Sequence, residues 1–393
     1  MAQSVAGDLL TGQHVRSLQE SRTIESIPDR RLQAIVFIMG LFHLKMAMAD
    51  AIHRIFLDDN SLISHIAQIC PKETSKIQSD PGFCRMHEVI QHVGITSWIE
   101  AWRQEASECK SGIKSLSDFA ESKPTWEEVC SMANDMARKY VATDDLTEQH
   151  SRSDRDRDKQ FENMLETSYA LNFGDIGQVE ALFLPWMMIF AGCGKHKYAA
   201  EMRRYLENVH FIYPPRLAHA IRMNILVNPT GKQGQFCALD WVVEHNNLYI
   251  KRIYGGKYAN HQKSRIIDES LLIEAYKNIR HQFEQMFCFE HRASRHSPPR
   301  MEITFKKLTK YMEEKKTYAT VKGRNSAYSI PDIMSQGLDV LTTRAHFDVE
   351  VYAESLRAGE ELEDEDVEVE VENEWSELAD GQEEVEDDGS LDL

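Results

Sequence analysis

Strand-like sequence is confined to the first forty residues of this 393-residue chain, and this limits the fold more than any other feature. Ser4 to Asp8 is short and apolar, and Gln33 to Met39 (QAIVFIM) is a compact apolar run that Gly40 closes. Such runs are typical of buried strands. Gly12 to Glu25 can hold a short helix, and Leu41 to Phe56 favours one. The order strand, helix, strand, helix predicts one end of an α/β layer.

Helical patterns occupy most of the remaining sequence, so the middle and the C-terminal part of the body are expected to be mainly α. His150 to Gln160 (HSRSDRDRDKQ) is highly charged and has no apolar residue. It indicates a solvated linker or the outer turn of a helix, and we place a subdomain boundary there. The expected helices lie at about Met86–Glu108, Thr125–Tyr140, Phe161–Leu171, Asp175–Phe190, Lys197–Asn208, Arg216–Val227, Ala238–Tyr254, Glu269–Phe289 and Glu302–Lys315.

The net charge of −18 belongs to the end of the chain. Residues 358–393 contain 18 of the 63 acidic residues and no Lys or Arg, which leaves 45 acidic residues against 45 basic ones in the rest. A block of like charge with few aromatic residues cannot bury enough apolar surface to offset the entropy of ordering. We therefore expect a disordered acidic tail that solubilises the chain or binds a protein partner.

Several classes of protein are excluded by the sequence. The seven cysteines are scattered and odd in number, and no secretory signal opens the chain, so a reducing, intracellular location is expected. The most apolar windows, Ala34 to Phe42 and Ala181 to Gly194, are shorter than the ~20 residues that span a bilayer. The stretch Gly192-Cys-Gly-Lys195 lacks the earlier Gly and the Ser/Thr of a phosphate-binding loop. The sequence therefore gives no support for a nucleotide cofactor.

Two further signals carry little weight. Two Cys-x2-His pairs lack the paired Cys spacing of structural zinc modules, so zinc is not expected. The members of these two half-sites are Cys84, His87 and His92, and Cys288, His291 and His296. Basic residues interleave with tyrosines in several stretches and can follow a nucleic-acid backbone, but solvated helix faces are the alternative. These stretches are Lys195–Lys197, Arg203–Arg204, Lys251–Lys257, Arg292–Arg300 and Lys306–Lys316.

The most informative stretch runs from Asn228 to Lys251. On a helical wheel, Asp240, Glu244, Asn247 and Lys251 fall in one narrow polar stripe between two apolar margins. A solvated face would be broader, so the stripe indicates a buried helix that turns carboxylates toward an internal polar site, which can hold a divalent cation. The alternative is structural: Asp240 caps its own helix, and Glu244 pairs with Lys251 or with a neighbouring helix.

Two residues near the predicted strands join this candidate site. Asp8 follows the first strand, where α/β sheets commonly present ligand-binding groups, although it can also form a turn or an N-cap. His43 lies one turn into the helix after the second strand, and Asp50 lies two turns further along the same face. His43 can bind a metal or phosphate, or it can be a hydrogen-bonded core residue.

Four segments occur in this order: GDLLT near residue 8, GLFHLKMAMADAIHR, AGCGKHKYAAEM, and NPTGKQGQFCALDWVVEHNNLYIK. Together, over about residues 4–290, they resemble a family of domains of unknown function from mushroom-forming fungi, which is itself similar to the ribonuclease-H-like transposases. The resemblance implies the two-strand part of a ribonuclease-H-like core with a large helical insertion. It also implies DNA as a partner, Mg²⁺ or Mn²⁺ as a cofactor, and a nuclear location.

The resemblance assigns roles to the candidate residues. In this class of transposase, catalytic acids lie on the first strand, after the fourth strand and on the last helix. Asp8 would be the acid after the fourth strand and Glu244 the acid on the last helix, with Asp240 one turn before it. These three carboxylates are the implied metal ligands. The implied supporting residues are His43, Asn247 and Lys251.

The resemblance also predicts a loss of activity. Only seven residues precede Asp8, so the first three strands and the first catalytic Asp are missing. Two-metal phosphoryl transfer needs several carboxylates to hold cations about 3.5–4 Å apart. We therefore expect an N-terminally truncated, catalytically inactive DNA-processing domain. The alternative is a non-enzymatic helical interaction protein whose acidic tail binds a partner.

The expected organisation has four parts. They are a partial α/β core at residues 1–60, a mainly helical insertion at 61–237, C-terminal helices including the acidic-stripe helix at 238–345, and a disordered acidic tail at 358–393.

Overall fold

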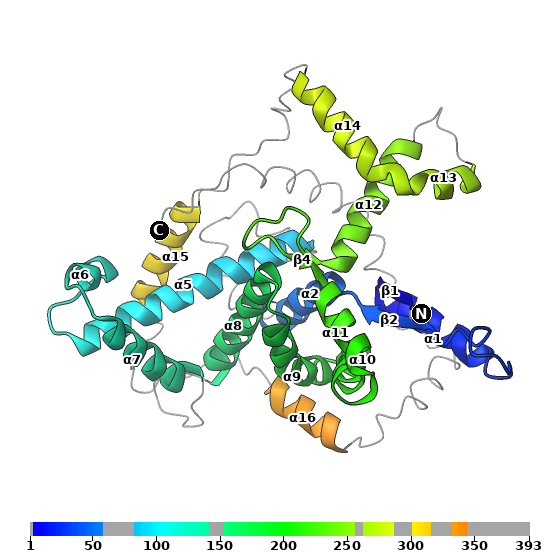
Figure 1. Ribbon diagram of the computed structural model, residues 1–393. Helices are drawn as coiled ribbons and strands as arrows, with labels where there is room; N and C mark the ends of the chain where they lie inside the picture. Colours follow the sequence, from blue (N-terminus) through cyan, green and yellow to red (C-terminus); the bar gives the residue numbers. More distant parts are fainter. Residues whose placement is uncertain are drawn as a thin grey trace.

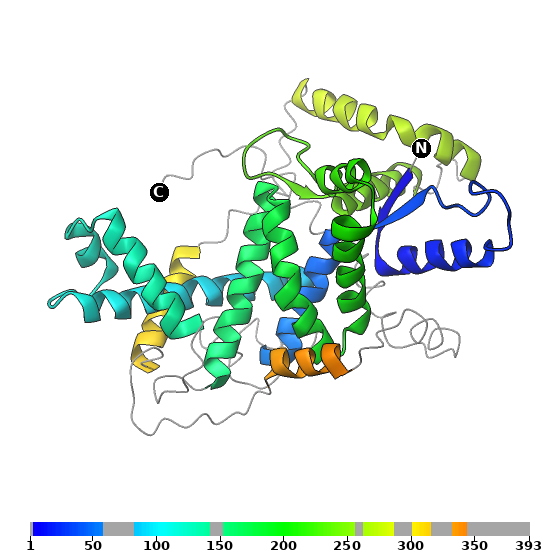
Figure 2. The same ribbon diagram turned by 60° about the horizontal axis from the view of Figure 1, so that its bottom comes forward.

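The N-terminal segment forms the strand and helix order that the sequence predicts. In a computed structural model, it consists of β1 (Gln3–Gly7), α1 (Leu9–Ser21), β2 (Ile35–Met39) and α2 (Leu41–Ile52). The strands pair in parallel along all five residues of each. A parallel pair needs a crossover connection, which α1 supplies, and Figure 2 shows α1 beside the two strands. The structure describes residues 3–57, 82–141, 152–255, 262–286, 301–315 and 332–343.

The rest of the described chain is mainly helical, with the long α5 crossing the body (Figure 1). None of its helices is both long and apolar enough to cross a membrane. The helices are α5 (Phe83–Cys109), α6 (Leu116–Glu121), α7 (Trp126–Met136), α8 (Arg152–Phe173), α9 (Ile176–Gly192), α10 (His196–Glu207), α11 (Pro215–Asn224), α12 (Leu239–Tyr254), α13 (Lys263–Glu269), α14 (Ile273–Met286), α15 (Met301–Lys315) and α16 (Ile333–Thr343). Shorter helical turns are η1 (His53–Leu57), η2 (Ala137–Val141), η3 (Asn208–Ile212) and η4 (Ser270–Leu272).

Two local predictions are corrected, and one of two alternatives is confirmed. The charged stretch forms the first turns of α8 from Arg152 onward, which confirms the helical alternative over the linker. The helix expected to reach Val227 ends at Asn224, because the next residues form β3 (Leu226–Val227), which pairs antiparallel with β4 (Cys237–Ala238). The helix expected from Glu269 is interrupted by η4. The acidic tail at 358–393 lies outside the described residues, and the four-part division stays a prediction.

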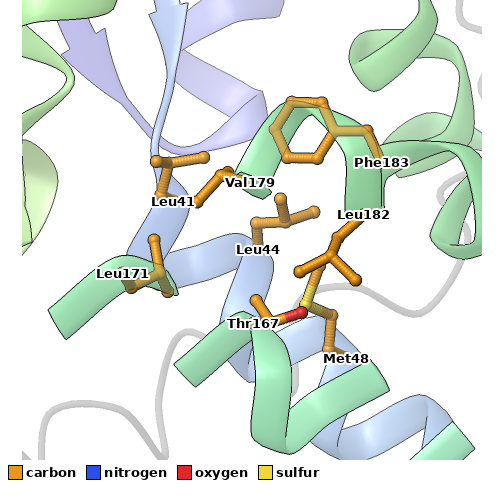
Figure 3. Close-up of a pocket in the computed structure, with 8 residues that line it drawn as sticks. All are labelled: Leu41, Leu44, Met48, Thr167, Leu171, Val179, Leu182 and Phe183. Atoms are coloured by element: carbon orange, nitrogen blue, oxygen red, sulfur yellow. The ribbon is translucent and has the colours of Figure 1, made fainter. Parts of the chain in front are cut away.

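Helix α2 is buried at the centre of the helical body. Leu41, Leu44 and Met48 are each at most 2% exposed, and they face apolar side chains of α8 and α9 (Figure 3). The space between these helices is only about 10 Å³, which is too small for a ligand. The polar atoms at its border are also paired, since the Trp186 indole donates to the Thr167 hydroxyl at 3.1 Å. Because the side chains of α2, α8 and α9 leave so little space between them, their packing fixes the position of α2 and of the residues at its N-terminus.

Helices α9 and α16 approach each other through glycines. A Cβ at Gly337 of α16 would lie 1.7 Å from the carbonyl oxygen of Met188 in α9. A Cβ at Gly192 would lie 2.2 Å from the carbonyl oxygen of Ile333. Because backbone cannot move aside as a flexible side chain can, both positions require glycine.

Gly337→Ala is therefore expected to lower the free energy of unfolding by about 1–3 kcal/mol, as overpacking typically does. Alanine normally stabilises a helix interior by about 1 kcal/mol relative to glycine, so the sign is reversed here. The matched control is Gly177→Ala in α9, where the nearest atom to the new Cβ is Asp175 Oδ1 at 3.5 Å. That variant should be neutral or slightly stabilising in urea denaturation. Equal effects of the two substitutions would contradict the close crossing.

Candidate functional site

Asp240 caps a helix that lies far from it in the sequence. Its side chain is 2% exposed, and its two carboxylate oxygens accept hydrogen bonds from the backbone N–H of Phe42 at 3.0 and 3.1 Å. The N–H of His43 donates to Oδ2 at 3.1 Å. The first N–H groups of a helix have no partner within the helix, so Asp240 satisfies those of α2. The alternative that Asp240 caps its own helix is wrong, because the N-cap of α12 is Ala238.

Gly40 makes room for this carboxylate. A Cβ at this position would lie 2.3 Å from Asp240 Oδ2 and 2.8 Å from the carbonyl oxygen of Gly7. The N–H of Gly40 donates to that same carbonyl at 2.8 Å, which joins the ends of β1 and β2. Sequence reasoning missed this role, because Gly40 was interpreted only as the residue that closes a strand. The sequence signal that could have revealed this role is the position of Gly40 between a predicted strand and a predicted helix.

His43 connects the other candidate residues. Its Nδ1 lies 3.0 Å from Asp240 Oδ2, which confirms the alternative of a hydrogen-bonded histidine. Burial lowers the pKa of the His43 imidazole, but the hydrogen bond to Asp240 and the charges of Asp240, Glu244 and Asp8 outweigh burial, and the pKa is raised. The structure therefore brings three carboxylates from sequence-distant segments within electrostatic range of one imidazole.

The outer residues of the site have simpler contacts. Asp8 Oδ1 accepts a hydrogen bond from the N–H of Thr11 at 2.7 Å, so Asp8 is the N-cap of α1, as one of its predicted alternatives stated. Glu244 Oε2 accepts from Asn247 Nδ2 at 3.4 Å. Asn247 and Lys251 are exposed, so the predicted polar stripe is buried only at its Asp240 end.

A divalent cation does not fit the Asp240 carboxylate in this arrangement. Its oxygens already accept hydrogen bonds from two backbone N–H groups and contact one imidazole nitrogen. Two-cation sites need carboxylate oxygens that remain available to the metals. Within the ranges that the structure describes, no three His, Cys, Asp or Glu side chains are arranged to hold a metal ion. The metal-binding roles of Asp8 and Glu244 stay predictions.

A second ion cluster ties the segment around residue 195 to α2. Lys195 Nζ lies 2.7 Å from Asp50 Oδ2, and Arg54 Nε lies 3.0 Å from the same oxygen. Burial raises the pKa of Asp50, but the two cations outweigh it and the pKa is lowered. Segments near residues 8, 43, 195 and 240 thus all meet around α2.

Some of the basic residues that suggested nucleic-acid binding lie in ion pairs. Arg203 Nε is 2.7 Å from Glu207, and Arg204 Nη1 is 2.7 Å from Glu201. The Arg203–Glu207 pair is exposed and agrees with the alternative of a solvated helix face, whereas Glu201 is buried. The basic stretch Arg292–Arg300 and the half-site from Cys288 to His296 lie outside the described residues. In the other half-site, His87 Nε2 contacts the Ser168 hydroxyl at 3.2 Å.

A comparison with known proteins identifies the family of this chain. Residues 1–296 match the model of a family of unknown function (DUF6589), and this range contains all the candidate site residues. No curated protein matches the chain, and no solved structure does. The likeness to transposases therefore stays a prediction.

Proposed function

The chain belongs to the DUF6589 family, and we propose that it is a DNA-processing domain of the ribonuclease-H-like transposase class whose acidic site no longer catalyses. The observation that carries the proposal is the position of Asp240. It reaches the ends of β1 and β2 from a helix nearly two hundred residues further along the chain.

The chain order supports the class. Two parallel strands are followed by a long helical stretch, and α12 then returns to contact β1 and α2. Ligand-binding groups of α/β proteins gather at the carboxyl ends of parallel strands. Asp8 follows β1, Gly40 follows β2, and Asp240 and Glu244 arrive on α12. This is the arrangement that the resemblance implies for the acids of such a core.

The hydrogen bonds of the acidic residues support the loss of catalysis. The Asp240 carboxylate accepts hydrogen bonds from backbone N–H groups at the N-terminus of α2, and Asp8 Oδ1 accepts one at the N-terminus of α1. Both carboxylates therefore stabilise helices, and both oxygens of Asp240 already accept hydrogen bonds in place of the metals that phosphoryl transfer requires. The site has kept its position in the fold and changed its role.

The test combines binding and cleavage. Fluorescence anisotropy with a labelled DNA duplex should show binding that weakens as salt increases, because phosphate contacts release counterions. Supercoiled plasmid with Mg²⁺ or Mn²⁺ should remain uncut by the wild type. Cleavage that Glu244→Gln abolishes and the exposed control Val243→Ala on the same helix leaves unchanged would overturn the loss of catalysis. No DNA binding at low salt would overturn the DNA-processing role.

A second function is favoured by an exposed apolar row that begins at the end of η4 and continues along α14. Leu272, Ile279 and Met286 are 47%, 62% and 80% exposed, and together with Tyr276 and Phe283 they are spaced alternately by four and three residues. This is the spacing of a coiled-coil seam, which a second copy of the chain would complement. Under this alternative the chain is a helical interaction protein. Ile279→Glu should then abolish a dimer in light scattering, whereas the neighbouring exposed control Asn278→Glu should preserve it.

A further inference from the structure

A cavity lies between the N-terminal α/β unit and the helices that cover it. It has a volume of about 210 Å³ and is bordered by α1 and β2 on one side and by α10, η3 and α11 on the other. Figure 1 shows α10 and α11 next to the two strands. An engineered cavity of about 150 Å³ can hold benzene, so this one has room for a single ring and a small substituent. It is separate from the Asp240 cap and shares no lining residue with that cap.

One wall of the cavity is apolar. Ile35, Phe37 and Met39 of β2 contribute to it, and Val209 and Ile221 lie on the helical side. Such a wall favours the body of an organic ligand over a bare inorganic ion, because burial of apolar surface contributes about 25 cal/mol per Å².

The polar end carries an excess of positive charge. Arg16 Nη1 lies 3.0 Å from Glu201 Oε2, and Arg204 Nη1 lies 2.7 Å from the same oxygen. The Glu201 side chain is only 8% exposed, so these charges interact with little screening by water. Two guanidinium groups and one carboxylate leave one net positive charge among the lining residues.

The remaining polar groups of the lining do not cancel that charge. Burial, together with the charge of Glu201, raises the pKa of Tyr213, so its hydroxyl stays protonated and can donate. Tyr205 directs its hydroxyl to Glu180, at 3.2 Å. Glu180 is in turn paired with Arg222 at 2.8 Å, outside the lining. The cavity thus combines an apolar wall, a protonated hydroxyl and two arginines.

We propose that this cavity binds a small organic monocarboxylate with a single ring or a branched apolar body. Guanidinium groups recognise carboxylates through strong charge-assisted hydrogen bonds, and the net charge of the lining calls for one negative charge on the ligand. The β2 wall takes the apolar body, and Tyr213 supplies a further donor. The inference does not depend on the DNA-processing function.

The test uses titration calorimetry on the full chain with three probes. Phenylacetate should bind, and uncharged phenylacetamide, which has the same shape, should bind at least tenfold more weakly. Inorganic phosphate, which lacks the apolar body, should also bind at least tenfold more weakly than phenylacetate. Val15→Phe, which narrows the cavity from α1, should weaken phenylacetate binding at least tenfold.

Variants on α10 give a matched comparison. Arg204→Gln should weaken phenylacetate binding at least tenfold, whereas Arg203→Gln should leave it unchanged, because Arg203 is exposed and pairs with Glu207 outside the cavity. Circular dichroism would establish that each variant is folded, and Arg16→Gln replaces Arg204→Gln if the latter is not. The proposal is overturned if phenylacetate does not bind, if the amide or phosphate binds equally well, or if the folded arginine variant retains wild-type affinity.

Discussion

Asp240→Ala is expected to lower the free energy of unfolding by about 3 kcal/mol. Loss of a helix cap costs about 0.5–2 kcal/mol, and loss of hydrogen bonds to a charged group costs about 1.5–3 kcal/mol. The Asp240 carboxylate combines both contributions, because it accepts from the N-terminus of α2 and contacts the His43 imidazole. The substitution also leaves a cavity beside Gly40, which has no side chain to fill it.

Two controls make this result specific. Asp240→Asn keeps the size and one acceptor oxygen, so we expect about half the effect. Glu244→Ala removes a carboxylate one turn further along α12, where the side chain is partly exposed, and should change stability by less than about 0.5 kcal/mol. The measurement is urea denaturation followed by circular dichroism. Equal effects of Asp240→Ala and Glu244→Ala would show that the cap does not stabilise the fold.

The second large effect is acid destabilisation through His87. Burial, with a smaller contribution from the charge of Lys45, lowers the pKa of His87 to about 3. Burial also lowers the pKa of Lys45, to about 8. The Ser168 hydroxyl donates to the Met164 carbonyl, so its oxygen is left to accept from the neutral His87 ring.

The sign follows from proton binding in the two states. Unfolded His87 binds a proton as the pH falls below about 6.5, whereas the folded state binds it only near pH 3. Each pH unit in this window therefore lowers the free energy of unfolding by up to about 1.4 kcal/mol, and the whole window by roughly 3 kcal/mol because His87 is not fully buried. His87→Gln should flatten the stability profile between pH 6.5 and 3. An unchanged acidic slope in this variant would contradict the assignment.

His43→Gln is the matched control, because the pH dependence of stability that His43 contributes has the opposite sign. Its folded pKa is raised above 6.5, so its contribution is fully present below pH 6.5 and is lost as the pH rises through the folded value. His43→Gln should therefore change the profile above pH 6.5 and leave the acidic slope intact. Comparison of the two variants with the wild type separates these histidines from the other titrating groups.

The N-terminal elements were predictable because their signals are local. Apolar runs specified β1 and β2, and uninterrupted helix-favouring sequence specified α2. Sequence reasoning failed where a few residues had two acceptable conformations. Leu226 and Val227 continue a helical pattern, but pairing with Cys237 and Ala238 makes them a strand. Tertiary contacts decide such short segments, because intrinsic propensities are small.

The residues of the candidate site were predictable, but the role of Asp240 was not. The wheel placed Asp240 and Glu244 on one face of α12, and chain order placed Asp8 and His43 after the strands. The sequence could not show that Asp240 would cap α2, because hydrogen-bond partners nearly two hundred residues apart have no mutual sequence signal.

The sequence by itself determined the N-terminal strands and most of the longer helices, because periodicity, capping and propensity act over a few neighbouring residues. Only the tertiary structure decided what the carboxylates do. Packing of α12 against α2 directs a buried charge to a helix N-terminus, where it is stabilised by backbone N–H groups. Packing also encloses Arg16 and Arg204 around a cavity that neither α1 nor α10 forms alone.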